Sequence, residues 1–164
     1  LILNAKLSIT SAFDEFKKEY EGSVSPFIKE IMDEWLNAVF GKDSNSAMEV
    51  DLNPNGTLRG IKKLNIGANI NVKGFSKGEE QAINTLLRLA IGKILNESGK
   101  YKFTQVIDDP IQNLDNDKID ALLKIINELS NETPIIMIAV NNQLIENYDK
   151  LKIEKRLKVE EIIN

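Results

Sequence analysis

The sequence contains neither cysteine nor histidine, and the two absences exclude several kinds of chemistry. Without cysteine there are no disulfides, thiol nucleophiles or thiolate zinc sites, which fits a reducing compartment. Without histidine there is no histidine-based triad, imidazole base or histidine metal site. Any metal site formed by this chain must therefore use carboxylates, amides and hydroxyls, a ligand set that favours hard ions such as Mg²⁺.

The chain also lacks a strong charge of one sign and a long apolar run. Its formal net charge is −4 over 164 residues, so any contact with DNA would be a local patch. No apolar run reaches the roughly 18 residues that a membrane span needs, and the opening LILNAKL lacks the features of a signal peptide. We therefore predict a cytoplasmic domain with its own core and no membrane partner. The missing initial methionine suggests a fragment of a longer chain.

The first 41 residues predict two helices. Apolar side chains recur at loose helical spacing over residues 1–20, and Gly22 interrupts the pattern. A second helix is expected from Ser25, as N-cap, and Pro26, in the first turn, to Phe40. Gly41 would end this helix.

The remainder predicts a small β region followed by an α/β unit. Alternating segments flank an Asn-Pro-Asn-Gly turn at residues 53–56, which indicates hairpins. A helix to about residue 96, a strand over 101–107, a helix over 117–130 and an apolar run over 134–140 come next. The apolar run is typical of a strand buried on both faces of a parallel sheet. Residues 150–162 alternate and predict a terminal hairpin. The fold class is therefore α/β, with ligands expected at the carboxyl ends of the strands.

The start of the central helix, Ser76-Lys77-Gly78-Glu79, allows two interpretations. Serine followed three residues later by glutamate is a capping box, which by itself indicates only a well-formed helix start. However, glycine in a first turn costs about 1 kcal/mol relative to alanine, and a missing side chain lets a ligand approach the backbone. Free amides and the helix dipole make such a tip an anion site.

Two adjacent acids, Asp108 and Asp109, follow the predicted strand, and Pro110 ends it. At the carboxyl end of a strand, one acid can hold Mg²⁺ through water. The other can orient or deprotonate a water that attacks a phosphoryl group. The alternative is a polar turn, and Asp115 could likewise be a simple N-cap.

The order of these segments resembles the C-terminal half of an ABC-type ATPase head. FSKGEEQ is similar to the ABC signature motif, FTQVIDD to a Walker B strand and QNLD to a D-loop. The helix and hairpins before them, and the glutamate-rich signature, are more like the Rad-fifty/SMC branch of DNA-repair and chromosome ATPases than like membrane transporters. The likeness is closest from Gly74 to Val140.

The resemblance implies roles for individual residues. Ser76 and Gly78, with Lys77 and Glu79 in the same motif, would bind ATP held by a second head across a head dimer. Asp108 would hold Mg²⁺ and Asp109 would be the general base. Asp115 would communicate across the dimer.

The chain departs from the family pattern at three places. Asp109 stands where the family usually has glutamate, which is one methylene longer. Asn141 stands at the position of the switch histidine, and asparagine can donate a hydrogen bond to phosphate but cannot carry a proton. No G-x-x-x-x-G-K-[ST] phosphate loop is present. Slow hydrolysis, or ATP-gated dimerisation, therefore stays open.

The resemblance also implies partners and boundaries. Residues 1–22 would be the end of a coiled coil and residues 23–164 the C-terminal lobe, with the phosphate loop in a separate N-terminal lobe. Further partners would be a second head, DNA and a nuclease, at the nucleoid. Two alternatives remain: a magnesium nuclease or topoisomerase-primase-like domain with ligands Asp108, Asp109, Asp115 and Asp117, and a non-hydrolysing interaction module.

Overall fold

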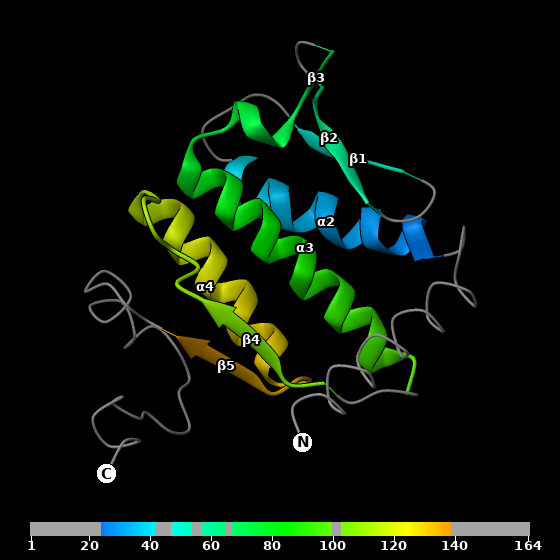
Figure 1. The fold of residues 1–164 in the computed structure, drawn as a ribbon, viewed down its shortest axis with the longest axis vertical. Helices are drawn as coiled ribbons and strands as arrows, with labels where there is room; N and C mark the ends of the chain where they lie inside the picture. The colour runs from blue at the N-terminus through cyan, green and yellow to red at the C-terminus, as the bar shows by residue number, and fades with distance from the viewer. Residues whose placement is uncertain (1–23, 42–46, 54–56, 65–66, 100–102, 139–164) are drawn as a thin grey trace, which may run out of the picture.

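The computed structural model describes residues 24–41, 47–53, 57–64, 67–99 and 103–138. Its elements in chain order are α2 (Val24–Phe40), β1 (Met48–Leu52), β2 (Leu58–Lys63), β3 (Ala68–Ile70), the 3-10 helix η2 (Val72–Gly74), α3 (Lys77–Glu97), β4 (Gln105–Asp108), α4 (Asn116–Ser130) and β5 (Ile135–Ile138). The helices lie between a three-stranded sheet at one end and a two-stranded sheet at the other (Figure 1). The predicted α/β class is confirmed. Within these ranges no helix is long and apolar enough to cross a membrane.

Helix α2 forms because its apolar residues recur at three- and four-residue spacing. Ile28, Met32, Leu36 and Val39 are all buried, and the helix packs against β1, α3 and α4. It begins at Val24, so Ser25 lies in the first turn and the prediction of an N-cap at Ser25 is wrong by two positions. Its end at Phe40, next to Gly41, is as predicted.

The predicted β region is an antiparallel sheet in the order β1-β2-β3. Two side chains of α2 cover the outer edge of β1. The Asn37 amide donates to the Met48 carbonyl at 2.8 Å and accepts from the Met48 amide at 2.9 Å. Asp33 accepts from the Val50 amide at 2.6 Å. These bonds replace a neighbouring strand, so the edge is closed to pairing with another chain.

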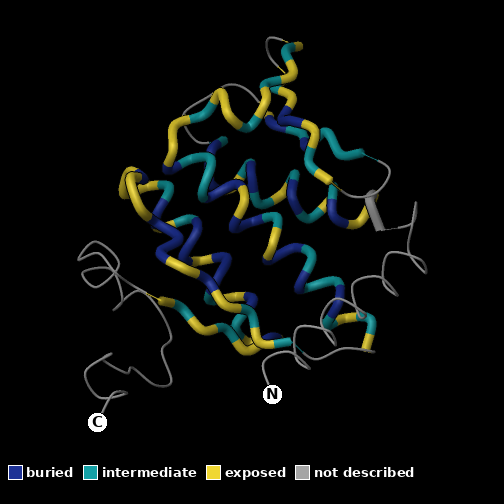
Figure 2. Tube along the Cα trace, in the orientation of Figure 1, coloured by how far each residue is buried: buried dark blue, intermediate teal, exposed yellow. Residues whose placement is uncertain are grey.

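A single core joins the inner faces of the helices to the antiparallel sheet. Figure 2 shows the buried residues along the facing sides of α2, α3 and α4. Fully buried members include Met32, Leu36, Ile61, Ile83, Leu86, Ile119 and Leu122. Each such side chain contributes about 1.5–3 kcal/mol through burial, which fixes the helices that carry the site.

The sheet of β4 and β5 is parallel, as predicted, but only one of its faces is covered. Val106 and Ile136 are register partners, and they are 58% and 53% exposed. Ile138 on the same face is 46% exposed. The prediction of burial on both faces is therefore wrong for the described strand, because helices cover the Ile107 side and no described residue covers the other.

Other boundaries shift by a few residues. Strand β4 begins at Gln105, whereas the prediction began it at residue 101; α4 begins at Asn116, one residue before the predicted start. The helix predicted over residues 1–20, the boundary at 22/23, the hairpin over 150–162 and Asn141 lie outside the described residues.

Candidate functional site

The start of α3 is the capping box that the sequence predicts. The Ser76 hydroxyl accepts from the Glu79 amide at 3.3 Å, and Glu79 Oε2 accepts from the Ser76 amide at 3.1 Å. The Ser76 hydroxyl also donates to Glu79 Oε2 at 2.9 Å. Ser76 and Lys77 are exposed. The amides of Lys77 and Gly78 belong to the first turn, whose N–H groups have no partner within a helix.

A lysine that the sequence analysis missed connects this cap to the start of α4. Lys118 Nζ lies 3.1 Å from Glu79 Oε1 and 2.8 Å from Asp115 Oδ2. Asp115 is itself the N-cap of α4 and accepts from the Lys118 amide at 3.0 Å. Lys118 is close to Asp115 in sequence but 39 residues from Glu79, so only the fold brings the three together.

The ion pairs shift the pKa values of all three groups. Burial favours the uncharged forms of Lys118 and Glu79, but the opposite charges and hydrogen bonds outweigh it: the pKa of Lys118 is raised and that of Glu79 is lowered. The Lys118 hydrogen bond lowers the pKa of Asp115. Lowered carboxyl pKa values give stability that is lost on acidification, and a raised amine pKa gives stability that is lost at high pH. The network is therefore strongest near neutral pH.

Gly78 is buried, and its missing side chain admits a neighbouring loop of the same chain. A Cβ at this position would lie 2.4 Å from the Asn113 carbonyl oxygen and 2.7 Å from that of Gln112. Asn113 has a positive φ of 59°, so the loop turns tightly here. A ligand was expected to approach the backbone at Gly78; in the structure the loop before Asp115 occupies the space of the missing side chain.

We expect alanine at Gly78 to be strongly destabilising. The methyl group would meet backbone atoms, which cannot rotate away, so the loop would have to move; overpacking of this kind costs about 1–3 kcal/mol. Urea unfolding measures the loss. Gly41→Ala is the matched control, because a Cβ there meets only Asn37 atoms at 3.6–3.7 Å. Equal midpoints for the two variants would contradict the close packing of α3 on this loop.

The two acids after β4 have different surroundings. Asp108 is exposed, whereas Asp109 is only 8% exposed and its Oδ1 has no hydrogen-bond partner. Asp109 has a φ of 42° and its amide donates to the Ile138 carbonyl at 2.9 Å. Burial, with a smaller contribution from the Asp108 charge, raises the pKa of Asp109. A strained backbone and an unpaired buried carboxyl are typical of functional positions.

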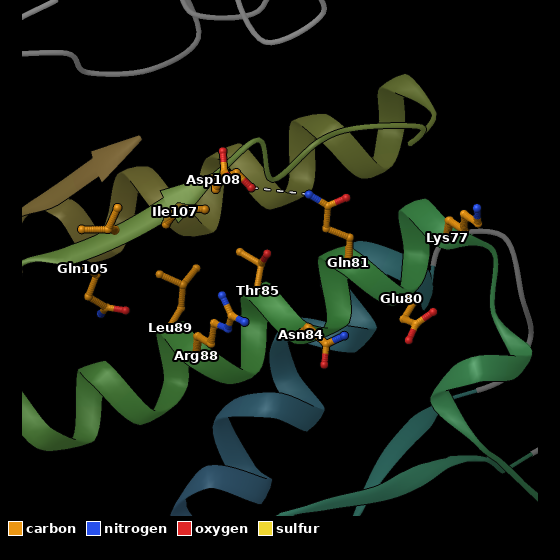
Figure 3. Close-up of a pocket in the computed structure, with 11 residues that line it drawn as sticks. Lys77, Glu80, Gln81, Asn84, Thr85, Arg88, Leu89, Gln105, Ile107 and Asp108 are labelled. Atoms are coloured by element: carbon orange, nitrogen blue, oxygen red, sulfur yellow. Dashed lines mark hydrogen bonds between the residues drawn. The ribbon is translucent and has the colours of Figure 1, made fainter. Parts of the chain in front are cut away.

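Gln81, which the sequence analysis left without a role, holds the backbone of this acid pair. Its Nε2 donates to the Asp109 carbonyl at 2.7 Å and lies 3.4 Å from the Asp108 carbonyl. Figure 3 shows the side chain pointing from α3 toward the end of β4. The contact spans 28 residues, so sequence position alone gave no signal. It fixes the signature-like helix to the strand that ends in the acids.

A groove of about 840 Å³ lies between α3 and β4. Lys77, Gln81 and Arg88 line it from α3, and Val106 and Asp108 from β4. Lys77 and Asp108, both predicted ligand-binding residues, therefore lie on the same groove. Asp109, which is buried, is not among the lining residues.

The predicted residues thus form two groups. The first comprises Ser76, Gly78, Glu79 and Asp115, and Lys118 contacts its two carboxylates. The second comprises Asp108 and Asp109, whose backbone Gln81 contacts from α3. Within the described part of the chain, no three acidic residues gather into a set that could hold a metal ion. Asp108, Asp109, Asp115 and Asp117 all lie in that part, so the four-carboxylate site of the nuclease alternative is not formed.

No protein-family model and no curated protein sequence matches the chain. Solved structures do match. One, from work on ATP-driven dimerisation and DNA-stimulated activation of SMC ATPases, has a TM-score of 0.52 at 18% identity, and the match covers 81% of this chain and 78% of that one. Another, an SMC head bound to the C-winged helix domain of ScpA, has a TM-score of 0.53 at 20% identity, covering 74% of this chain and 36% of that one. The chain has the α/β fold of SMC-like ATPase heads.

Proposed function

We propose that this chain is the C-terminal lobe of a Rad-fifty/SMC-like ATPase head. It would supply the signature motif, Walker B strand and D-loop to an ATP site completed at a head dimer. One observation carries the proposal: the capped start of α3, the acids after β4 and the start of α4 are joined by direct contacts through Gln81 and Lys118. If the three short motifs resembled those of the family only by chance, there would be no reason for their residues to be in contact.

The uncovered face of β4 and β5 supports a second lobe. In the described residues the parallel sheet has only two strands, and Val106, Ile136 and Ile138 leave one of its faces apolar and exposed. Parallel sheets are normally covered on both faces. The sequence has no phosphate loop, so a lobe that carries one and packs on this face would supply both missing parts.

The residues fit magnesium and phosphate. Asp108 offers a single exposed carboxylate, which suits Mg²⁺ because this ion usually keeps waters and takes one or two carboxylates beside substrate phosphates. When bound, Mg²⁺ neutralises charge on the phosphates. Ser76 and the first-turn amides of α3 would bind the γ-phosphate of the nucleotide on the opposite head, with Lys77 adding positive charge.

Asp109 would orient the attacking water and accept its proton. Its buried, unpaired Oδ1 marks a carboxyl that the fold does not use for its own hydrogen bonding. Gln81 would keep its backbone in place. Because Asp109 does not line the groove, an adjustment at this residue would accompany nucleotide binding, which would make turnover slow.

The wider setting belongs to the same proposal. Related heads were studied for ATP-driven dimerisation and DNA stimulation, and in complex with ScpA. We propose a second head as partner here, with DNA and a nuclease as further partners, at the nucleoid in the cytoplasm. Residues 1–22 would end a coiled coil and Asn141 would face the phosphates.

The test is reconstitution. The chain, mixed with the lobe that carries the phosphate loop, should hydrolyse ATP with Mg²⁺ and form head dimers when ATP is added. The separate chain should do neither. ATP-driven dimers without turnover would select the non-hydrolysing alternative. The absence of both dimers and turnover would refute the proposal.

A further inference from the structure

Lys118 lies at the centre of a hydrogen-bonded chain between two helix starts. The Ser76 hydroxyl donates to Glu79 Oε2 at 2.9 Å, and the other Glu79 oxygen is 3.1 Å from Lys118 Nζ. The ammonium group then reaches Asp115 at 2.8 Å. It also lies 5.8 Å from the centroid of the Phe40 ring, and its side chain is only 17% exposed. The packing thus holds the lysine between the carboxylates.

Neither helix cap requires this ammonium group. Glu79 already caps α3 through the Ser76 amide, and Asp115 already caps α4 through the Lys118 backbone amide. A lysine on the surface of α4 could pair with Asp115 alone. The additional bond to Glu79 joins the same two segments that also meet where Gly78 packs on the Gln112–Asn113 backbone.

The two carboxylates create an electrostatic difficulty for the proposed site. Glu79 and Asp115 flank the helix tip at which a phosphate would bind, and unneutralised they would repel it. Lys118 is the cation that contacts both. When the Ser76 hydroxyl turns toward a phosphate, Glu79 loses that donor, and Lys118 remains to hold its charge.

We propose that Lys118 is a positioning residue that neutralises Glu79 and Asp115 and thereby lets the α3 tip and the α4 start bind the opposite nucleotide as one unit. The inference rests on the proposed function. It assigns a role to a residue outside the three motifs, one that acts through its neighbours and does not touch the nucleotide.

The experiment measures the ATP concentration that gives half-maximal head dimerisation, using heads reconstituted from this chain and the phosphate-loop lobe. Lys118→Met should raise that concentration about tenfold, which is within the usual range of coupling between sites. Lys118→Arg, which keeps the charge, should stay within about threefold of the unchanged protein. Lys118→Gln provides a second neutral variant if the methionine variant fails to fold.

A double-mutant cycle separates this role from general stability. In a Glu79→Gln background, loss of the Lys118 charge should change the midpoint by only about threefold, because Asp115 is then the one carboxylate of the pair left without its cation. Lys124→Met is the matched control: Lys124 is on the same helix, 78% exposed, and 3.9 Å from Glu128. Its midpoint should not move.

The outcomes distinguish the two proposals. If unchanged heads do not dimerise with ATP, the proposed function fails and this inference fails with it. If they dimerise and Lys118→Met behaves like Lys124→Met, or shifts the midpoint equally with and without Glu79, only the role of Lys118 is refuted. The role of Lys118 is supported if Lys118→Met shifts the midpoint tenfold, Lys118→Arg keeps it near that of the unchanged protein, and the shift is smaller in the Glu79→Gln background.

Discussion

Asp109→Asn should nearly abolish ATP hydrolysis by reconstituted heads while leaving ATP-bound dimers intact. General-base catalysis contributes about 10²–10⁴-fold to rates, so we expect turnover to fall at least a hundredfold. Asparagine has almost the same shape and can keep the backbone bonds to Ile138 and Gln81, but it cannot accept a proton. Turnover and dimer lifetime are measured on the same samples. Unchanged turnover would remove Asp109 from the mechanism.

The same variant should increase the stability of the fold at neutral pH. Burial raises the pKa of Asp109, so the ionised carboxyl is less stable in the folded protein than in the unfolded chain. A raised acid pKa means that stability falls as pH increases from about 3.8, the ordinary value, through the folded-state value. Removing the charge should therefore stabilise the fold at pH 7.

Urea unfolding at two pH values tests this directly. The gain at pH 7 should disappear near pH 3, where the wild-type carboxyl is protonated in both states, so the acidic measurement is the internal control. A gain of equal size at both pH values would show that the change in packing, and not the charge, is responsible.

Features encoded locally were predictable from the sequence. The Ser76–Glu79 capping box and the apolar stripe of α2 depend on spacing within short segments, and the parallel arrangement of β4 and β5 follows from the order strand, helix, strand. Ser25 shows the limit of such local signals: serine before proline favours a cap, but the helix already begins at Val24. Intrinsic helix propensity determines local structure only weakly where tertiary contacts compete with it.

Features that depend on contacts between distant segments were not predictable. An apolar run such as that over residues 134–140 cannot reveal whether a second layer is present, and here the described residues leave one face uncovered. The glycine at position 78 indicated a close approach to the backbone, but the expected neighbour was a ligand, and the observed one is the Gln112–Asn113 backbone. Gln81 and Lys118 make their decisive contacts 28 and 39 residues away, and no periodicity records such pairs.

Ser76→Arg should prevent ATP-driven pairing of heads. Ser76 is exposed at the α3 tip, where an arginine would project a long, bulky side chain into the space that the proposal gives to the opposite γ-phosphate. The change also removes the N-cap, which costs about 1 kcal/mol. We expect the single head to stay folded while its dimerisation at saturating ATP falls below detection in size-exclusion chromatography with light scattering.

Two variants separate steric blockage from the other effects of this change. Ser76→Ala loses the same cap and hydroxyl without added bulk, so it should weaken pairing by about tenfold, as expected for one hydrogen bond to a charged group, without preventing it. Asn131→Arg adds the same side chain at the exposed far end of α4 and should leave pairing unchanged, which controls for added charge. If Ser76→Arg heads still pair with ATP, the proposed contact between Ser76 and the opposite phosphate is wrong.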